Sequence, residues 1–437
     1  MAGARALAIT VLLSGCAAVT SGPSRTSGAP ASGTYPATTQ SSLQTLADTP
    51  TMTAAITASP GHRCGDSRGT SPLPQYAFPR VSIPLGSDAC QDIGPFTHPK
   101  FLDLTNDGSL VAFNAADYDH QGELWFGDLA TGSVKIVYQA NEPASTRVDV
   151  WWPQLAGGQL VWLEYVHEGA DVYTPVKQWF VKDMDLATRQ VRAVAQGFTP
   201  REGGQMLVKE IRYDGWQIGM TESLASGWQI QIIDLAGRVH ATIPTASYTF
   251  DVALVGDGVL YSTGTEDTVD GTVGLMHLWH WTPADGATEI GKDVFQINAD
   301  GNLAAWVTDP VASQHSMGNF QVARLYEAAT PYTSSQPISP VDTETGSKGI
   351  DGMACGSGTV AWWERENYKG AWSDVLTLWQ PGWSSPLQVD TEGNESYRVS
   401  DRGGWLVWTE EFGRDADPLL ERVRGVPLAV LTAQRPS

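Results

Sequence analysis

The stretch Asn106–Val137, NDGSLVAFNAADYDHQGELWFGDLATGSVKIV, decides the fold of this chain. It contains three short apolar strands joined by turns, Leu110–Asn114, Glu123–Leu129 and Val134–Val137. Asp107-Gly108 is a pair that favours a tight turn, and Ala130-Thr131-Gly132 turns the chain again. One further strand, Phe101–Leu104, lies directly upstream. The stretch therefore predicts a unit of four antiparallel strands.

The same pattern recurs along the chain, each time with a glycine that opens the second strand. The intervals between these glycines are about 43 to 57 residues, and Asp, Gly or Ser precedes each of them, as a tight turn requires. The seven copies are GSLVAFN from Gly108, GQLVWLE from Gly158, GWQIGMT from Gly215, GVLYSTG from Gly258, GNLAAWV from Gly301, GTVAWWE from Gly358 and GWLVWTE from Gly404.

Repeats of four strands at this spacing are typical of a β-propeller. One four-stranded sheet cannot bury both of its faces, whereas sheets packed around an axis can. The sequence therefore predicts an all-β fold, a β-propeller with seven four-stranded blades over residues 98–437. Val426–Leu431 is expected to be the fourth strand of the last blade, so that every copy supplies its own four strands.

An N-terminal segment, residues 61–97, is expected to join the propeller. Within it, Val81–Leu85 alternates apolar and polar residues. We expect this short strand either to add to the outer edge of the last blade or to cover the axial opening.

The unit from Asn106 to Gly132 resembles the blade repeat of TolB-type, WD-repeat-like propellers. That repeat has Ser-Pro-Asp-Gly before an apolar strand, and here Thr105-Asn106 stands in place of Ser-Pro. The resemblance extends over about Phe101 to Leu431 and implies the propeller fold. It implies no particular function, because such blades occur in proteases, translocation factors and sensors.

The N-terminus has the pattern of an export signal. Arg5 precedes the apolar run Ala6–Leu13, which is too short to span a bilayer. Leu13-Ser14-Gly15-Cys16 resembles the lipobox of bacterial lipoproteins, which implies a signal peptide at residues 1–15 and acyl chains, such as palmitate, on Cys16. The alternative is an ordinary signal peptide cut near Ala17-Ala18.

Residues 16–60 are expected to form a flexible, disordered tether that begins at the lipidated Cys16. The segment is rich in Ala, Ser, Thr, Gly and Pro, and it has too little apolar bulk to bury a core. Together with the lipobox, it predicts a protein held at the cell membrane by its lipid and facing outside the cytoplasm.

The charge balance restricts the possible partners. The chain has 27 Lys and Arg against 48 Asp and Glu, a net charge of −21. This charge argues against nucleic acid and against docking on anionic lipid, so that only the N-terminal lipid would contact the membrane.

Four cysteines occur in the chain, and one of them is the lipobox Cys16. Among the others, a Cys64–Cys90 disulfide is our first expectation and Cys90–Cys355 is the alternative, because spacing does not determine connectivity. No C-x-x-C pair is present, so the cysteines do not predict a zinc site.

No catalytic motif stands out. The sequence lacks G-x-S-x-G, H-E-x-x-H, a P-loop, G-x-G-x-x-G and a calcium-binding loop. We therefore expect no catalytic residue, no metal and no cofactor.

The most suggestive pattern is Trp-x-Glu at the end of the second strand, which places the Trp and the Glu on one face of the strand. Two interpretations remain open: a rim that binds a ligand, or packing between blades with Glu bonded to a neighbouring turn. The pairs are Trp162 and Glu164, Trp362 and Glu364, and Trp408 and Glu410.

Long insertions follow the second strand in several copies and are expected on one face of the propeller. One of them carries Tyr368 and Trp372. Loops gathered on one face are where propellers bind partners. The sequence therefore predicts a binding or protein-interaction module for an envelope protein or a cell-wall glycan. The alternative is a carbohydrate-binding or glycoside-hydrolysing enzyme that uses rim carboxylates.

Overall fold

The computed structural model is built from strands that pair with their neighbours in sequence. It describes residues 80–82, 90–97, 101–115, 122–140, 143, 145–171, 174–198, 208–224, 227–245, 247–264, 276–308, 322–327, 348–368, 371–384, 386–390, 399–412 and 420–434. Within this part, 28 strands form seven sheets, and one short helix follows the last strand. In the same part, no helix is long and apolar enough to cross a membrane.

The first four sheets each consist of four consecutive antiparallel strands. Sheet 1 contains β3 (Phe101–Asp107), β4 (Leu110–Ala115), β5 (Glu123–Asp128) and β6 (Ser133–Gln139). Sheet 2 contains β7 (Val148–Ala156), β8 (Gln159–His167), β9 (Val176–Asp185) and β10 (Val191–Phe198). Sheet 3 contains β11 (Val208–Tyr213), β12 (Gln217–Leu224), β13 (Gly227–Asp234) and β14 (Val239–Thr245). Sheet 4 contains β15 (Tyr248–Val255), β16 (Gly258–Gly264), β17 (His277–Thr282) and β18 (Gly286–Lys292).

The remaining three sheets are less regular. Sheet 5 has three described strands, β19 (Val294–Asp300), β20 (Leu303–Thr308) and β21 (Val322–Glu327). Sheet 6 contains β22 (Lys348–Gly356), β23 (Thr359–Tyr368), β24 (Ala371–Trp379) and β25 (Leu387–Asp390), with β1 (Arg80–Ser82) parallel to β25. Sheet 7 contains β26 (Val399–Arg402), β27 (Trp405–Phe412) and β28 (Leu420–Pro427), with β2 (Gln91–Thr97) antiparallel to β28.

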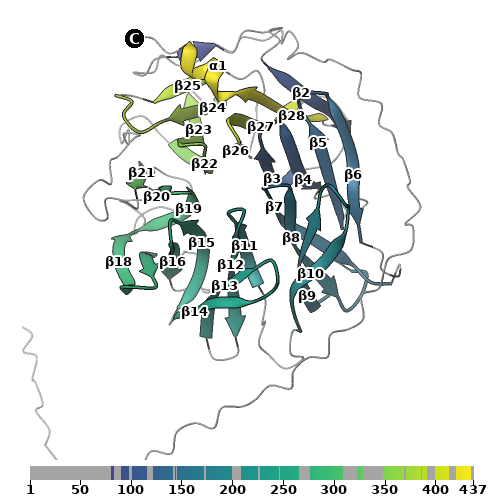
Figure 1. Cartoon of the computed structure of the whole chain (residues 1–437). Helices are drawn as coiled ribbons and strands as arrows, with labels where there is room; N and C mark the ends of the chain where they lie inside the picture. Colours follow the sequence, from purple (N-terminus) through teal and green to yellow (C-terminus); the bar gives the residue numbers. More distant parts are fainter. Residues whose placement is uncertain are drawn as a thin grey trace, which may run out of the picture. The chain divides into compact units, whose positions relative to one another are not determined.

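The sheets follow one another around a circle. The first strand of each sheet lies next to the first strand of the following sheet, in the order β3, β7, β11, β15, β19, β22 and β26, and β26 lies next to β3. Figure 1 shows this course, with the yellow β28 beside the blue β2. This arrangement is a β-propeller.

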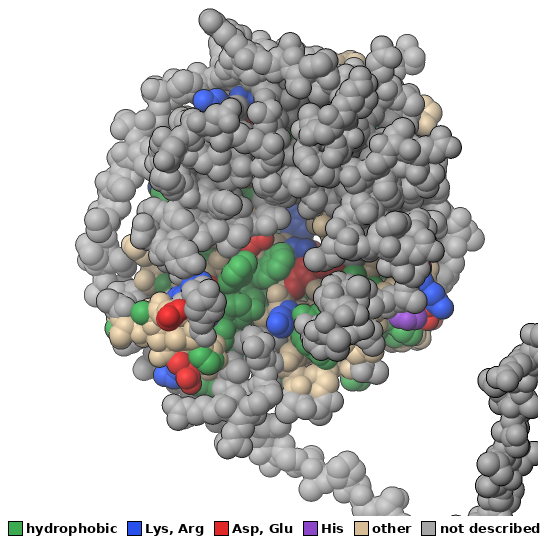
Figure 2. All heavy atoms as spheres, turned by 180° about the vertical axis from the view of Figure 1, so that it is seen from behind, with side chains coloured by type: hydrophobic (Ala, Val, Ile, Leu, Met, Phe, Trp, Pro, Cys, Tyr) green, Lys and Arg blue, Asp and Glu red, His purple; other side chains and the backbone are tan. Residues whose placement is uncertain are grey.

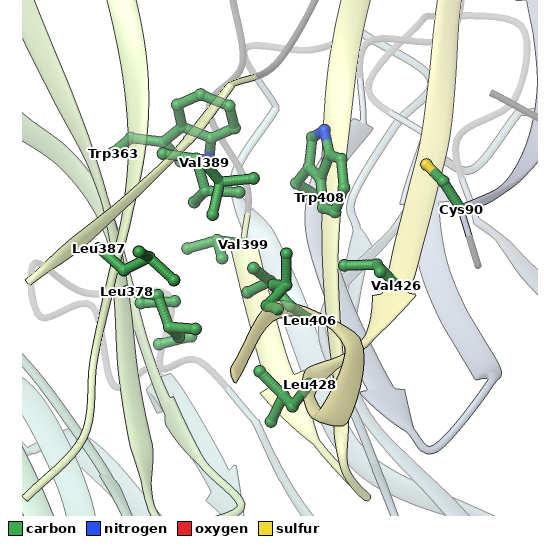
Figure 3. Packing of buried hydrophobic residues seen from close by; sticks show 14 residues of the cluster. Cys90, Trp363, Leu378, Leu387, Val389, Val399, Leu406, Trp408, Val426 and Leu428 are labelled. Carbon is green, nitrogen blue, oxygen red and sulfur yellow. The ribbon is translucent and has the colours of Figure 1, made fainter. Parts of the chain in front are cut away.

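The hydrophobic core lies between the sheets. The buried apolar residues of the described part form seven clusters, and each cluster is shared by two neighbouring sheets. Figure 3 shows the cluster between sheets 6 and 7, where Trp363 and Leu378 face Trp408 and Leu406 and the helix α1 (Leu428–Ala433) contributes Leu428. Burial at these seams is the main force that closes the circle.

The tight turns between first and second strands all lie on one face, which we call the turn face. There the sheets approach so closely that a Cβ atom on Gly403 would lie 1.9 Å from the backbone nitrogen of Gly108. Gly403 also has a φ of 61°, in the left-handed region that favours glycine. On the opposite face, which we call the loop face, each second strand connects to the third.

The structure corrects three expectations about the strands. Six of the seven sheets have four or more described strands, whereas sheet 5 has three. The fourth strand of sheet 7 is β2 from the N-terminal segment, because the chain after Pro427 forms α1 instead of a strand. Of the predicted strand Val81–Leu85, the structure describes Val81 and Ser82, and these belong to β1, which pairs with the outer strand of sheet 6 and not with the last sheet.

Candidate functional site

The first Trp-x-Glu pair, Trp162 and Glu164, is inside the seam between sheets 1 and 2. Trp162 is 0% exposed and Glu164 2%. The Trp162 ring packs against Tyr138, with 4.7 Å between ring centroids. Glu164 accepts a hydrogen bond from the Tyr138 hydroxyl at 2.6 Å, and its other oxygen lies 2.6 Å from the Lys182 ammonium. This carboxylate therefore joins two sheets and is already neutralised.

The second pair, Trp408 and Glu410, is equally buried. Glu410 is 0% exposed and accepts a hydrogen bond of 2.7 Å from the Trp408 indole. Its other oxygen lies 2.9 Å from the Arg424 guanidinium, which is also buried. Lys182 and Arg424 occupy equivalent positions in their sheets. Each lies on the third strand, directly opposite the Trp of the second strand.

In the third pair, only Trp362 can be placed with its side chain. It is 0% exposed and packs in the seam between sheets 5 and 6. The side chains of Glu364, Tyr368 and Trp372 lie outside the described residues. The backbone pairs Tyr368 with Ala371 and Asn367 with Trp372, so Tyr368 and Trp372 flank the turn between β23 and β24 on the loop face.

These positions support the packing interpretation of the Trp-x-Glu pattern, although Glu164 and Glu410 bind cations of the seam and not a neighbouring turn. Trp162, Glu164, Trp362, Trp408 and Glu410 lie inside the seams and do not form an exposed rim. Both faces of a propeller blade are covered by neighbouring blades, so residues that alternate along a central strand are buried on either face. Glu164 and Glu410 each bind a cation within the seam, and this use of the carboxylates argues against glycoside hydrolysis by them.

A different group of side chains gathers on the loop face over sheets 2, 3 and 4, which we call the aromatic patch. Its members, all half-buried, are Trp152, Tyr165, Trp228, Tyr248 and Phe250. The Tyr248 ring lies 4.4 Å from that of Trp228 and 4.3 Å from that of Phe250. Figure 2 shows apolar side chains gathered near the middle of the described surface, with acidic ones beside them.

Trp152 and Tyr165 meet at the start of β11 and pack against the apolar cluster between sheets 2 and 3. The Trp152 indole donates a hydrogen bond of 3.0 Å to the Lys209 carbonyl, and the Tyr165 hydroxyl donates to the Val208 carbonyl. Phe198 at the end of β10 adds an exposed ring on the same face and is 62% exposed. Grouped aromatic side chains of this kind mark interaction surfaces more often than isolated ones do.

Three carboxylates beside the patch bind the backbone of the next sheet. Each sits at an irregularity in the first strand of its sheet, where a β-bulge redirects the side chain. Asp103 accepts from the Trp152 amide at 3.0 Å, and Glu210 accepts from the Val252 amide at 3.1 Å. Asp251 accepts from the amides of Gln296 and Ile297. These contacts join the first strands of neighbouring sheets, which surround the propeller axis.

Arg212 supplies the positive charge among these carboxylates. Its guanidinium lies 2.5 Å from Glu210 and 5.5 Å from the centre of the Trp152 ring. Burial raises the pKa of Glu210 to about 8, although the nearby Arg212 opposes this effect. Burial also raises the pKa of Asp251, again against the influence of Arg212. The aromatic face of Trp152 is thus occupied by a cation of the protein itself.

Glu222 differs from these carboxylates, because it has no cationic partner in the part of the chain that the structure describes. Two neutral amides bind it, those of Gln229 at 2.7 Å and Gln231 at 3.1 Å. Burial raises its pKa, and the hydrogen bond from Gln229 counteracts this only in part. Glu222 lies near the end of the second strand of sheet 3, β12, and pairs with Gln229 near the start of β13.

The sequence patterns did not point to the aromatic patch, because its members come from first, second and third strands of three sheets. The sequence did contain a signal for the three carboxylates beside the patch. One acidic residue interrupts the apolar first strand in each of FLDL, VKEI and TFDV. In the described part of the chain, no three His, Cys, Asp or Glu side chains are placed to hold a metal ion.

Comparisons with known proteins concern the fold. No protein-family model matches the chain, and no curated protein matches its sequence. The propeller domain of the trilobed protease from Pyrococcus furiosus gives a TM-score of 0.51 at 12% identity, over 73% of this chain and 91% of that one. A puromycin-hydrolyzing peptidase from Mycobacterium tuberculosis gives 0.51 at 13% identity, over 82% of this chain and 55% of that one.

A structure from a study of two prolyl endopeptidases gives a TM-score of 0.52 at 10% identity, over 77% of this chain and 49% of that one. The chain is a propeller. At these identities the likeness shows the fold alone, and this propeller spans about half of the length of the two larger peptidase chains.

Proposed function

We propose that the chain is a binding module of the cell envelope, a propeller of seven blades that is lipid-anchored through Cys16 and receives a partner on its loop face. The observation that carries the proposal is the aromatic patch. Its rings are half-buried and gathered over three sheets, whereas the carboxylates of the seams are occupied by the protein's own cations.

Several features support the blade number and the location. The seven sheets and the seven seam clusters support seven blades, one of them with three described strands. The Leu13-Ser14-Gly15-Cys16 motif and the Ser- and Thr-rich tether support export and anchoring. A lipid at Cys16 would leave the propeller tethered outside the cytoplasm, within reach of an envelope protein or a cell-wall glycan.

Tyr368 and Trp372 extend the proposed binding face to sheet 6. The register places both beside the turn between β23 and β24, at the loop face. We propose that they contact the same partner as the aromatic patch, or a second part of it.

The test is affinity capture from the envelope of the source organism with the full-length chain as bait. Wild type is expected to retain one partner in stoichiometric amount. Retention is expected to be lost in Trp228→Ala/Tyr248→Ala and reduced in Tyr368→Ala/Trp372→Ala. The matched control is Trp216→Ala, because Trp216 is a 73% exposed indole on the turn face. Equal retention by all four proteins, or none by wild type, contradicts a loop-face binding module.

The anchor is tested separately. Cells fed a clickable fatty acid are expected to label the wild-type chain, and Cys16→Ala is expected to abolish the label and release the protein from the membrane fraction. Labelling that persists in Cys16→Ala contradicts the proposed anchor.

A further inference from the structure

We propose that His167 is a pH-sensitive latch. When both of its ring nitrogens carry a proton, it fastens the connection between β8 and β9 to the loop-face end of sheet 2, and loss of one proton releases that connection. The structure describes residues 168–171, 174 and 175 of the connection. The inference does not depend on the proposed function.

The imidazole of His167 lies between two acceptors. Nε2 is 2.9 Å from the Asp149 carboxylate on β7, and Nδ1 is 2.7 Å from the Thr174 carbonyl in the connection. His167 is 7% exposed, and Arg147 binds the other oxygen of Asp149 at 2.7 Å. Since only the protonated ring has two N–H donors, only this form satisfies both acceptors.

The bond to the connection is the one that deprotonation removes. A hydrogen bond to a charged carboxylate is stronger than one to a neutral carbonyl, so the remaining proton stays on Nε2 and faces Asp149. Nδ1 then presents a lone pair to the Thr174 carbonyl, and two acceptors face each other. Thr174 regains a donor for its carbonyl by moving away from the ring towards water.

The described part of the connection is tied together as a compact unit. The Thr174 amide donates to the Asp171 carbonyl at 3.1 Å, and the Thr174 hydroxyl donates to the Gly169 carbonyl at 3.2 Å. The Arg147 amide, which donates to the Gly169 carbonyl at 2.9 Å, fastens this unit to β7. His167 adds a second attachment, and its loss leaves the unit held less firmly.

The charges around the ring set the direction of the pH dependence. The hydrogen bond that His167 donates to Asp149 raises the pKa of His167 above 6.5, as does the one to the Thr174 carbonyl, while burial and Arg147 oppose the rise. The latch is therefore complete below pH 6.5 and is lost as the pH rises through the higher pKa of the latched state.

Other titratable groups surround the latch. Tyr165, which lies opposite Asp149 on β8, stays neutral in this range because burial raises its pKa far above the ordinary value. The remaining charged residues of the described elements around the ring are Glu168 and Asp171 in the connection, Lys177 on β9, and Lys209 and the Glu210–Arg212 ion pair on β11.

The latch adjoins the aromatic patch, because Tyr165 is a member of the patch and is two residues from His167. The loop face of sheet 2 would therefore present a fastened connection at acidic pH and a released one at alkaline pH.

Amide hydrogen exchange of the full-length chain between pH 6 and 9, corrected for the intrinsic rate at each pH, tests the release. Protection of the Glu168 and Thr174 amides is expected to fall about tenfold over this range, the effect of one lost hydrogen bond. Their exchange is expected to be faster than that of Leu163 in the middle of β8 and to depend little on urea, because a local opening exposes little surface.

Nitrogen NMR of the histidine rings tests the chemistry of the latch. The His167 ring is expected to carry protons on both nitrogens below its pKa and on Nε2 alone above it. His167→Gln identifies the signal and is expected to give low, pH-independent protection of Glu168 and Thr174. Asp149→Asn is expected to shift the release to lower pH, because it removes the charge that favours the protonated ring. His277→Gln, in an exposed pair with Glu289, is the matched control and is expected to leave the pH profile unchanged.

Three results would overturn the inference. Protection of Glu168 and Thr174 that is constant with pH in the wild type excludes a release. Exchange of these amides only together with Leu163 shows that the connection opens with the whole sheet and is not latched. A neutral His167 ring with its proton on Nδ1 shows that the bond to Thr174 survives deprotonation.

Discussion

Glu164 shows at the scale of one residue how this propeller uses buried charge. The carboxylate lies between Tyr138 of sheet 1 and Lys182 of sheet 2, and only 3% of the Glu164 side chain and 19% of the Lys182 side chain are exposed. Replacing one member of a buried pair leaves the other without a partner, which costs more than removing both.

We therefore expect Glu164→Ala to lower the free energy of unfolding by about 3 kcal/mol. Urea denaturation followed by tryptophan fluorescence measures the change. The double variant Glu164→Leu/Lys182→Met is the matched control and is expected to lose less than Glu164→Ala, because no unpaired charge remains. A double variant that loses more than the single one would show that the ion pair itself stabilises the seam.

His167 gives a second prediction at this scale, because both of its ring nitrogens face acceptors. Nε2 lies 2.9 Å from Asp149 and Nδ1 lies 2.7 Å from the Thr174 carbonyl, while Arg147 binds the other oxygen of Asp149 at 2.7 Å. A neutral imidazole can donate to only one of them. The hydrogen bond that His167 donates to Asp149 is the main influence that raises the pKa of His167 above 6.5, although burial and Arg147 oppose it.

The stabilisation from His167 is therefore fully present below pH 6.5 and lost as the pH rises through the higher folded-state pKa. We expect the difference in unfolding free energy between wild type and His167→Gln to be largest near pH 6 and to shrink towards pH 9. The control is His277→Gln, in an exposed pair with Glu289, which is expected to change stability little at any pH. A difference that is constant from pH 6 to 9 contradicts a protonated His167.

Sequence reasoning went only part of the way for these residues. The Trp-x-Glu spacing predicted correctly that the side chains of Trp162 and Glu164 lie on the same face of the strand, where both contact Tyr138. It did not identify Lys182 or Tyr138 as partners, because both come from other strands whose register the sequence does not specify. For the same reason, the sequence did not identify Arg424 as the partner of Glu410.

At the scale of elements, β2 is the strand that closes the circle. It begins directly after Cys90, which is disulfide-bonded to a partner outside the described residues. Asp92 of β2 lies 3.7 Å from Arg422 of β28. Cys355 is a free, buried thiol, so the alternative Cys90–Cys355 bridge is not the one in the structure. A Cys64–Cys90 bridge stays a prediction.

We expect Cys90→Ser to lower the free energy of unfolding by about 2–4 kcal/mol, because the disulfide restricts the unfolded chain and holds β2 at the closing sheet. Cys355→Ala, which removes a buried thiol that is not in a disulfide, is the control and is expected to cost less. Peptide mapping under non-reducing conditions is expected to find Cys90 joined to Cys64. Mapping of Cys90 to Cys355 would contradict the structure.

The sequence pattern predicted the second and third strands of the first sheet correctly. It did not predict β2 near the N-terminus or the helix α1 near the C-terminus. The predicted strand Leu110–Asn114 corresponds to β4, and Glu123–Leu129 to β5. In contrast, β2 has the sequence QDIGPFT, in which Gly94 and Pro95 interrupt any alternation. Its strand conformation depends on pairing with β28, which is more than 300 residues away and has no local signal.

At the scale of the whole molecule, aspartate side chains hold the first strands of neighbouring sheets together at more than one seam. The Asp103 carboxylate binds the amide of Trp152, Asp107 binds that of Gly157, and Asp300 binds that of Ser357. The turn residues singled out in the sequence therefore do more than permit tight turns. Their carboxylates reach the following blade, which only the arrangement of the sheets around the axis reveals.

Arg402 connects sheets across the turn face. It donates to the Tyr213 carbonyl of sheet 3 at 3.0 Å and lies 3.8 Å from Asp300 of sheet 5, although it belongs to sheet 7. The side chain therefore lies among first strands from opposite sides of the circle. Sequence spacing gives no hint of a contact between residues 189 positions apart.

Asn106, which is 0% exposed, joins the two sides of the closing seam between sheets 7 and 1. Its side-chain oxygen accepts from the Ser400 hydroxyl at 2.6 Å and from the Arg402 amide at 3.1 Å, and its nitrogen donates to the Arg402 carbonyl at 2.8 Å. Asn298 makes similar contacts to Met353 and Cys355 at the seam between sheets 5 and 6.

We expect Asn106→Ala to lower the free energy of unfolding by about 3 kcal/mol, because buried backbone groups on both sides of the seam lose their partners. Amide hydrogen exchange is expected to quicken in β3 and β26 first, since these strands meet at this seam. Asn298→Ala is expected to cost a similar amount and to quicken exchange in β19 and β22 instead. If both variants quicken exchange evenly in all sheets, the seams open together, and the circle behaves as one cooperative unit whose closure is not localised at Asn106.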